Sequence, residues 1–186
     1  ALLPLLVDLP RALFLGAAFM LPVAAILFIR FRRDFAWRDC RLLLAGVVVG
    51  TPLGLLLVEH LDRTLLIRGL GVVLLVFSLN ELLLADRWPL PIPATLAFPI
   101  GVVCGLLGAA FNIGGPPAVV WVQSRRWERA KAIATLQMMY LFNSGLRVLL
   151  TLPRGEAAEK SAIIGLLAIL PFLLLALTGN RLAELV

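Results

Sequence analysis

The stretch FNIGGPP, residues 111–117, interrupts an apolar run that extends from Leu90 to Val122. A membrane-crossing helix needs roughly 20 apolar residues, so a single helix over this run would overshoot the hydrocarbon layer. The prolines cannot donate helical hydrogen bonds, and Pro116 disfavours helical geometry at Gly115. Broken backbone at membrane depth survives only inside protein or beside a wet cavity, and paired broken helices mark transporter sites. The sequence therefore predicts a re-entrant hairpin, residues 90–122, with its corner here.

The composition is typical of a membrane protein. Hydrophobic residues make up 61% of the 186 residues and charged residues 15%, with a mean hydropathy of +1.01. A soluble core of this length could not hide so much apolar surface. The net charge of +6 lies in loops between apolar segments and not on a separable basic domain. We interpret these cations as topology signals, and we expect no nucleic-acid partner.

Six apolar segments are predicted to be helical or, in one case, broken-helical. They lie near Arg11–Ile29, Arg41–Val58, Leu65–Ala85, Leu90–Val122, Ala130–Leu152 and Ser161–Thr178. The fold class expected from them is an all-α membrane protein, a polytopic helical bundle. The basic loops 30–41 and 125–131 are predicted to be cytoplasmic, so the broken run starts and ends on one side. The tryptophans at cytoplasmic segment ends are expected to be interfacial: Trp37, Trp88, Trp121 and Trp127.

A weak internal repeat is visible at an offset of about 119 residues. It divides the chain into a first repeat, 1–89, and a second repeat, 90–186. Each repeat would contain one re-entrant hairpin and three crossings, an odd number, so the two repeats should be inverted. In this register the first hairpin and the last helix are missing. Together with Ala1 as first residue, this predicts a natural protein that is longer at both ends.

Polar residues on one helix are candidate substrate contacts, because each costs a few kcal/mol in hydrocarbon unless it is paired or hydrated. The helical period places four of them on one face, with a fifth beside them. They are Gln137, Tyr140, Ser144 and Arg147, with Asn143 adjacent. This face is expected to look inward. Alternatively, Arg147 snorkels to the outer headgroups, while Gln137 and Asn143 only hold helices together.

The corner itself supplies three further candidates: Asn112, Gly114 and Gly115. Asn112 either caps the corner amides, as asparagine often does in turns, or contacts the ligand. Successive backbone N–H groups near a helix N-terminus can bind an anion. Because prolines donate nothing, the candidate donors are the amides of Gly114, Gly115, Ala118 and Val119.

Other charged or reactive residues give no comparable signal. Arg68 and Glu81 lie near segment ends, where snorkelling is easy. Cys40 lies in a charged loop and Cys104 in an apolar run, without a CxxC pair, and His60 is the only histidine. Neither a disulfide framework nor a zinc site is predicted. HExxH and GxSxG motifs are also missing from the sequence, so we expect no enzyme, no metal and no cofactor.

Several short motifs in residues 101–150 carry a family resemblance. They are Gly105-Leu106-Leu107-Gly108, Ile113-Gly114-Gly115-Pro116-Pro117, Arg129-Ala130 and Asn143-Ser144. This segment resembles the second half of the sulfite exporter TauE/SafE family. The resemblance implies a permease of the bacterial inner membrane for sulfite, organosulfonates or related small anions, with glycine-rich turns near the substrate. The family's N-terminal glycine-rich turn has no match here, and Phe111-Asn112 replaces the glycines often seen before the GG pair.

The residues and the resemblance together predict a secondary transporter of small sulfur-containing oxyanions. Alternating access would operate around the corner and the polar face of Ala130–Leu152. The alternatives are an anion channel of the same architecture or a transporter of a different small organic anion. The expected partners are the anion and the lipid bilayer. A coupling ion, proton or sodium, and a homo-oligomer are compatible with this prediction.

Overall fold

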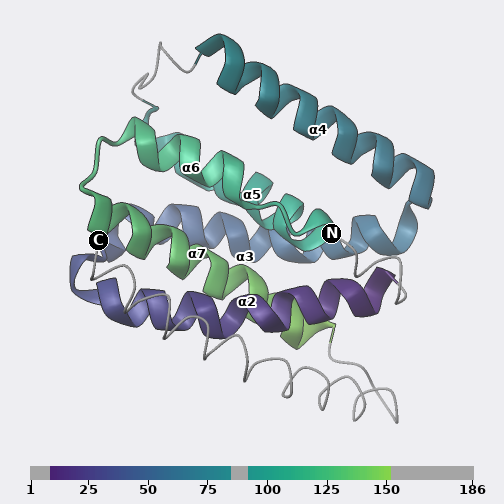
Figure 1. Cartoon of the computed structure of the whole chain (residues 1–186), viewed down its shortest axis with the longest axis horizontal. Helices are drawn as coiled ribbons and strands as arrows, with labels where there is room; N and C mark the ends of the chain where they lie inside the picture. Colours follow the sequence, from purple (N-terminus) through teal and green to yellow (C-terminus); the bar gives the residue numbers. More distant parts are fainter. Residues whose placement is uncertain (1–8, 85–91, 152–186) are drawn as a thin grey trace, which may run out of the picture.

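The computed structural model describes residues 9–84 and 92–151, and within these ranges every regular element is helical (Figure 1). The α-helices are α2 (Leu9–Phe31), α3 (Trp37–His60), α4 (Arg63–Leu84), α5 (Ala97–Phe111), α6 (Gly115–Ser124) and α7 (Arg129–Leu150). Two 3-10 turns, η1 (Arg32–Asp34) and η3 (Ala94–Leu96), precede α3 and α5. The all-α class is confirmed. The predicted segment Ser161–Thr178 and the boundary between the two predicted repeats lie outside the described residues.

The surface of the helices is largely apolar. Among the described residues, Trp37–His60 and Ala94–Phe111 are the two helices long and apolar enough to cross a membrane. Helix α4 lies to one side of the other helices (Figure 1). Its exposed large side chains include Leu65, Ile67, Val72, Leu75 and Leu82. Soluble monomers rarely expose contiguous apolar surface on this scale, whereas a hydrocarbon environment accommodates it.

Helices α3, α5 and α7 run in the same direction. Lys131 near the start of α7 forms an ion pair with Asp39 near the start of α3, at 2.9 Å. Further along, Asn143 of α7 hydrogen-bonds Thr51 of α3. Helix α2 runs the opposite way, because its Gly16 lies beside Asn112 at the far end of α5. The starts of α3, α5 and α7 therefore lie at one end of the bundle.

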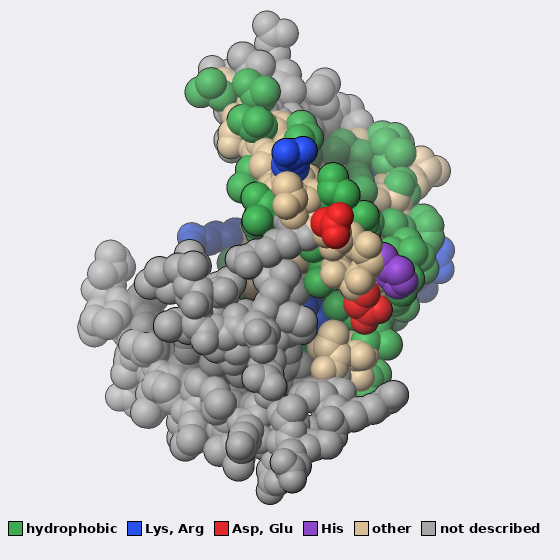
Figure 2. Space-filling view, turned by 90° about the vertical axis from the view of Figure 1, so that its right-hand side faces the viewer, with side chains coloured by type: hydrophobic (Ala, Val, Ile, Leu, Met, Phe, Trp, Pro, Cys, Tyr) green, Lys and Arg blue, Asp and Glu red, His purple; other side chains and the backbone are tan. Residues whose placement is uncertain are grey.

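We call this end the basic end, defined by residues 30–41 and 125–131. Its cations are Arg30, Arg32, Arg33, Arg38, Arg41, Arg125, Arg126, Arg129 and Lys131, against the acids Asp34, Asp39 and Glu128. The opposite end, where α3 is followed by α4, mixes acidic and basic side chains with hydrophobic ones (Figure 2). The two loops that the sequence groups together by charge are thus neighbours in space.

Helices α5 and α6 form a hairpin whose two outer ends lie toward the basic end. Trp121 and Val122 near the end of α6 share a core cluster with Leu43 of α3 and Ala97 at the start of α5. The chain therefore leaves the hairpin close to where it entered. Whether this pair is re-entrant in a bilayer stays a prediction, as does the inverted repeat.

Glycines hold α3 and α5 in close contact. Gly46, Gly50 and Gly54 of α3 recur every four residues, and a Cβ atom at each would overlap a backbone carbonyl oxygen of α5. Gly101 on α5 faces the Leu43 carbonyl of α3 in the same way. The predictions above do not include these glycines. Their spacing, small-xxx-small, is the signal that identifies such a contact between helices.

Two predictions about residues near the basic end are wrong. Cys40 does not lie in a loop, because α3 already begins at Trp37; its thiol is buried, 3.4 Å from the Thr135 hydroxyl. Both cysteines are buried and free. Trp121 is not interfacial: it is 1% exposed and packs edge-to-face on Trp127. The hairpin brings Trp121 back into the core, which its position near a loop did not reveal. Trp37 is exposed, and Trp88 lies outside the described residues.

Candidate functional site

Asn112 makes the turn between α5 and α6. Its backbone is left-handed, with φ 58° and ψ 28°, a conformation that asparagine tolerates better than most residues. Its N–H group donates to the Gly108 carbonyl oxygen at 3.0 Å, which closes the end of α5. Asn112 is therefore a cap, but not the cap that was predicted. It caps the carbonyl end of α5 through its backbone, whereas the prediction was that its side chain caps the corner amides.

The prolines begin α6 and do not break the chain, which corrects the predicted non-helical Gly115. Gly115 is the first residue of α6, and the prolines occupy its first turn, where a missing N–H group costs nothing. The clash that a proline imposes on the preceding residue acts partly through a Cβ atom, which glycine lacks. The first four N–H positions of a helix have no internal partner. In α6 these four positions are residues 114–117, and two of them are prolines. The N–H groups available to an anion are therefore those of Gly114 and Gly115. Ala118 and Val119, which were also predicted as donors, lie beyond these four positions.

Arg147 reaches from α7 to this turn. It is 1% exposed, and its Nη1 donates to the Gly108 carbonyl oxygen at 3.0 Å and to Asn112 Oδ1 at 3.2 Å. The guanidinium therefore lies against the carbonyl end of α5, where the helix dipole favours a cation. Of the two alternatives for Arg147, the inward orientation is the one observed.

One edge of the Arg147 guanidinium has no partner among the described residues. Nε and Nη2 are both buried, and neither has a hydrogen-bond acceptor in the described part of the chain. These two nitrogens lie on the same side of the planar group, so their N–H bonds form a fork. Such a fork matches two oxygens on one central atom, as in a carboxylate, a sulfite or a sulfonate. We call this edge the Arg147 fork.

Asn143 connects the three parallel helices one turn away from Arg147. Its Nδ2 donates to the Thr51 hydroxyl of α3 and to the Gly105 carbonyl oxygen of α5, both at 3.1 Å. A Cβ atom at Gly108 would lie 2.6 Å from Asn143 Oδ1, so glycine is needed there for the amide to fit. This arrangement matches the alternative in which Asn143 holds helices together. Thr51 was not predicted, because a threonine in an apolar helix carries no signal of its partner.

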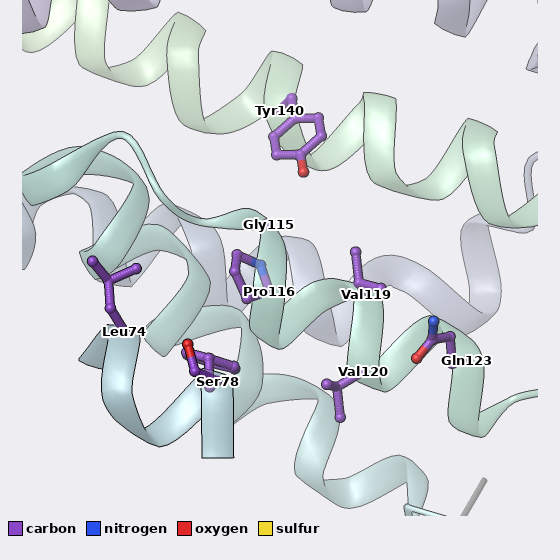
Figure 3. A pocket seen from close by; sticks show the side chains of 9 residues that line it. Leu74, Ser78, Gly115, Pro116, Val119, Val120, Gln123 and Tyr140 are labelled. Atoms are coloured by element: carbon purple, nitrogen blue, oxygen red, sulfur yellow. The ribbon is translucent and has the colours of Figure 1, made fainter. Parts of the chain in front are cut away.

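The other members of the polar face are distributed differently. Ser144 is buried and Gln137 partly buried, and neither belongs to the hydrogen-bond network that the described residues form around Arg147. Tyr140 turns its hydroxyl toward Gly115 (Figure 3). The two residues line a pocket of about 510 Å³, whose remaining walls are mostly apolar side chains of α4 and α6. The structure thus joins Asn112, Asn143 and Arg147 in one network and places Tyr140 beside the corner.

A family model described as Sulfite exporter TauE/SafE matches residues 1–186. The chain belongs to the sulfite exporter TauE/SafE family. The resemblance in residues 101–150 therefore extends over the whole chain, and the family is one of membrane transporters, not of enzymes. Comparisons with curated proteins and with solved structures gave no match. In this member of the family, the GGPP motif begins α6 and sets Gly115 against Tyr140.

Gly115→Ala should destabilise the corner, because the new Cβ atom would lie 2.6 Å from Tyr140 Oη. The obstructing oxygen is the free end of a side chain that borders a pocket, so the cost should lie at the lower end of the overpacking range, about 1 kcal/mol. Tyr140→Phe removes the obstructing oxygen, so the double variant should recover most of the lost stability. Unfolding of the four proteins of this double-mutant cycle in one detergent measures the coupling. Additive effects of the two changes would show that Gly115 and Tyr140 do not press on each other.

Proposed function

We propose that this TauE/SafE protein is a secondary transporter that carries small sulfur-containing oxyanions, such as sulfite or organosulfonates, and binds them at the Arg147 fork. The observation that supports this most strongly is the buried pair Nε and Nη2 of Arg147, which has no acceptor within residues 9–84 and 92–151. The family indicates a sulfur anion as the substrate class, and the Arg147 fork explains how such an anion would be bound. Sulfite and sulfonates both present two oxygens on one sulfur atom, which a planar guanidinium binds through two parallel hydrogen bonds.

The rest of the corner prepares the fork for binding. Gly108 and Asn112 hold Nη1, so the guanidinium plane is set before an anion arrives and little ordering is needed on binding. Gly114 and Gly115 lie at the start of α6, where free N–H groups and the helix dipole also favour an anion. Asn143 and Thr51 keep α3, α5 and α7 together around this point.

Uptake by proteoliposomes tests the proposal directly. The full chain would be reconstituted and challenged with labelled sulfite, an organosulfonate, a carboxylate and chloride. We expect saturable uptake of the sulfur oxyanions and little competition from chloride, which cannot engage two N–H groups through two oxygens. Uptake of a carboxylate alone would favour the alternative of a different organic anion. Flux that neither saturates nor shows counterflow would favour an anion channel.

We also propose that the basic end faces the cytoplasm of a bacterial cell, with the α5–α6 pair re-entrant from that side. The concentration of cations at this end supports the orientation through the positive-inside rule. The start of α3 and the start of α7 share this end, as the Asp39–Lys131 ion pair indicates. In this orientation the Arg147 fork lies toward the opposite, outer half of the bundle.

Cysteine labelling in intact cells checks the topology. Arg32→Cys and Arg126→Cys, each in a background lacking the native cysteines, should react from the cytoplasmic side because both positions are exposed at the basic end. Asp62→Cys, in the turn between α3 and α4, serves as the control and should react from the outside. Labelling of positions 32 and 126 from opposite sides would contradict both the re-entrant pair and the inverted repeat.

A further inference from the structure

Arg147 is the only buried charged side chain in the described part of the chain. The partners of its Nη1 are a backbone carbonyl oxygen and an amide oxygen, both of which are neutral dipoles. It forms no ion pair with any described residue, and its Nε and Nη2 have no acceptor there. The residues of the site therefore orient the cation without neutralising it.

A desolvated cation without a counter-charge is strongly unfavourable, and an opposite charge in good hydrogen-bonding geometry offsets much of this cost. Transport by alternating access requires the site to pass through a form that is closed to water on both sides. When an oxyanion occupies the Arg147 fork, the closed form contains a hydrogen-bonded ion pair. When none does, the described residues leave the guanidinium of the closed form without a counter-charge.

We propose that this protein is an anion exchanger, in which the closed form is crossed readily with an oxyanion on the Arg147 fork and only slowly without one. This inference rests on the proposed transport of oxyanions at Arg147 and specifies that the transport is an exchange of anions. The return of the carrier then requires a second anion, so one anion leaves for each that enters. Exchange of like anions moves no net charge over a full cycle.

Counterflow in proteoliposomes tests the mode. Vesicles containing the full chain are loaded with radiolabelled sulfite and diluted into either potassium sulfite or potassium chloride of equal ionic strength, with valinomycin to clamp the potential. External sulfite should accelerate release of the label by at least about tenfold, the factor expected when the unloaded crossing is limited by desolvation of a charge. Equally fast release into chloride would overturn the exchange mode.

Two variants separate the charge from the fork. Arg147→Lys keeps the cation but loses the planar fork, so sulfite should bind more weakly while the acceleration by external sulfite persists. Arg147→Gln removes the charge, so any remaining release should be nearly independent of external sulfite. A large acceleration of release by external sulfite in Arg147→Gln would show that the buried charge does not cause the acceleration. A loss of the acceleration in Arg147→Lys at saturating sulfite would also contradict this role of the charge, because lysine keeps it. Arg68→Gln, an exposed arginine on α4, is the matched control and should behave as wild type.

The two proposals fail in different ways. If vesicles take up and release no sulfur oxyanion under any condition, the proposed transport function is wrong, and the exchange mode falls with it. If sulfite crosses and saturates but its release ignores external sulfite, the transport function stands and the exchange mode is wrong.

Discussion

Arg147→Gln is expected to lower the affinity for sulfite by roughly one to two decades, because a hydrogen bond to a charged group contributes about 1.5–3 kcal/mol. The fork is buried, so water does not screen the interaction as it would at the surface. Equilibrium binding to purified protein in detergent, compared at equal folded fraction, measures the change. The sulfite affinity of Arg147→Lys should lie between those of wild type and Arg147→Gln, since the charge remains but the paired N–H geometry is lost.

A change at Arg147 also removes two hydrogen bonds that hold Gly108 and Asn112. For this reason folded fraction has to be matched before affinities are compared. Arg68→Gln removes an exposed arginine from another helix and controls for a general loss of positive charge. If Arg147→Gln binds sulfite as tightly as wild type does, Arg147 is not part of the binding site.

Gly50→Ala is expected to cause one of the largest losses of stability among the described glycines, together with Gly46→Ala and Gly101→Ala. A Cβ atom at Gly50 would overlap the Val102 carbonyl oxygen and lie 2.8 Å from the Val102 carbonyl carbon. Both are backbone atoms of α5, which no side-chain rotation can move away. The helices must separate, so the cost should reach about 3 kcal/mol, the upper part of the range for overpacked cores.

Gly69→Ala provides the matched control, because no atom lies within 4 Å of a Cβ atom at Gly69 on α4. Alanine is the better helix former by about 1 kcal/mol, so this variant should be neutral or slightly more stable. Unfolding of both variants in the same detergent, followed by circular dichroism, gives the comparison. Equal midpoints for Gly50→Ala and Gly69→Ala would show that α3 and α5 do not depend on glycine for their close contact.

The helices themselves were largely predictable. The segments expected near Arg11–Ile29, Arg41–Val58, Leu65–Ala85 and Ala130–Leu152 correspond to α2, α3, α4 and α7, with ends displaced by a few residues. The hairpin position was also close, but the residue that turns the chain was misjudged. Proline was expected to stop a helix, whereas here it starts α6, and the left-handed Asn112 makes the turn instead. Proline suits the first turn of a helix as well as the region just beyond one, so a break near proline does not reveal its own position.

The candidate site was predictable in its members but not in their partners. Helical periodicity placed Arg147 on an inward face and Asn143 adjacent to that face, and the structure shows both buried. The period could not show that Asn143 hydrogen-bonds Thr51 and Gly105, or that Nε and Nη2 of Arg147 find no acceptor in the described part of the chain. The glycines between α3 and α5 were readable from their four-residue spacing, although the helix that they contact was not.

The sequence by itself determined which segments are helical, where the apolar run is interrupted and which face of α7 is polar. These properties depend on residues within a few turns of one another, through hydrophobic length and the helical period. Only the tertiary structure decided that Arg147 lies inside, with Nη1 hydrogen-bonded and the Arg147 fork unpaired among the residues that the structure describes. That outcome depends on contacts with Gly108 and Asn112, 39 and 35 residues away along the chain. A long side chain near a helix end can extend either to solvent or to a neighbouring helix. The packing of α5 against α7 directs the Arg147 side chain to the neighbouring helix.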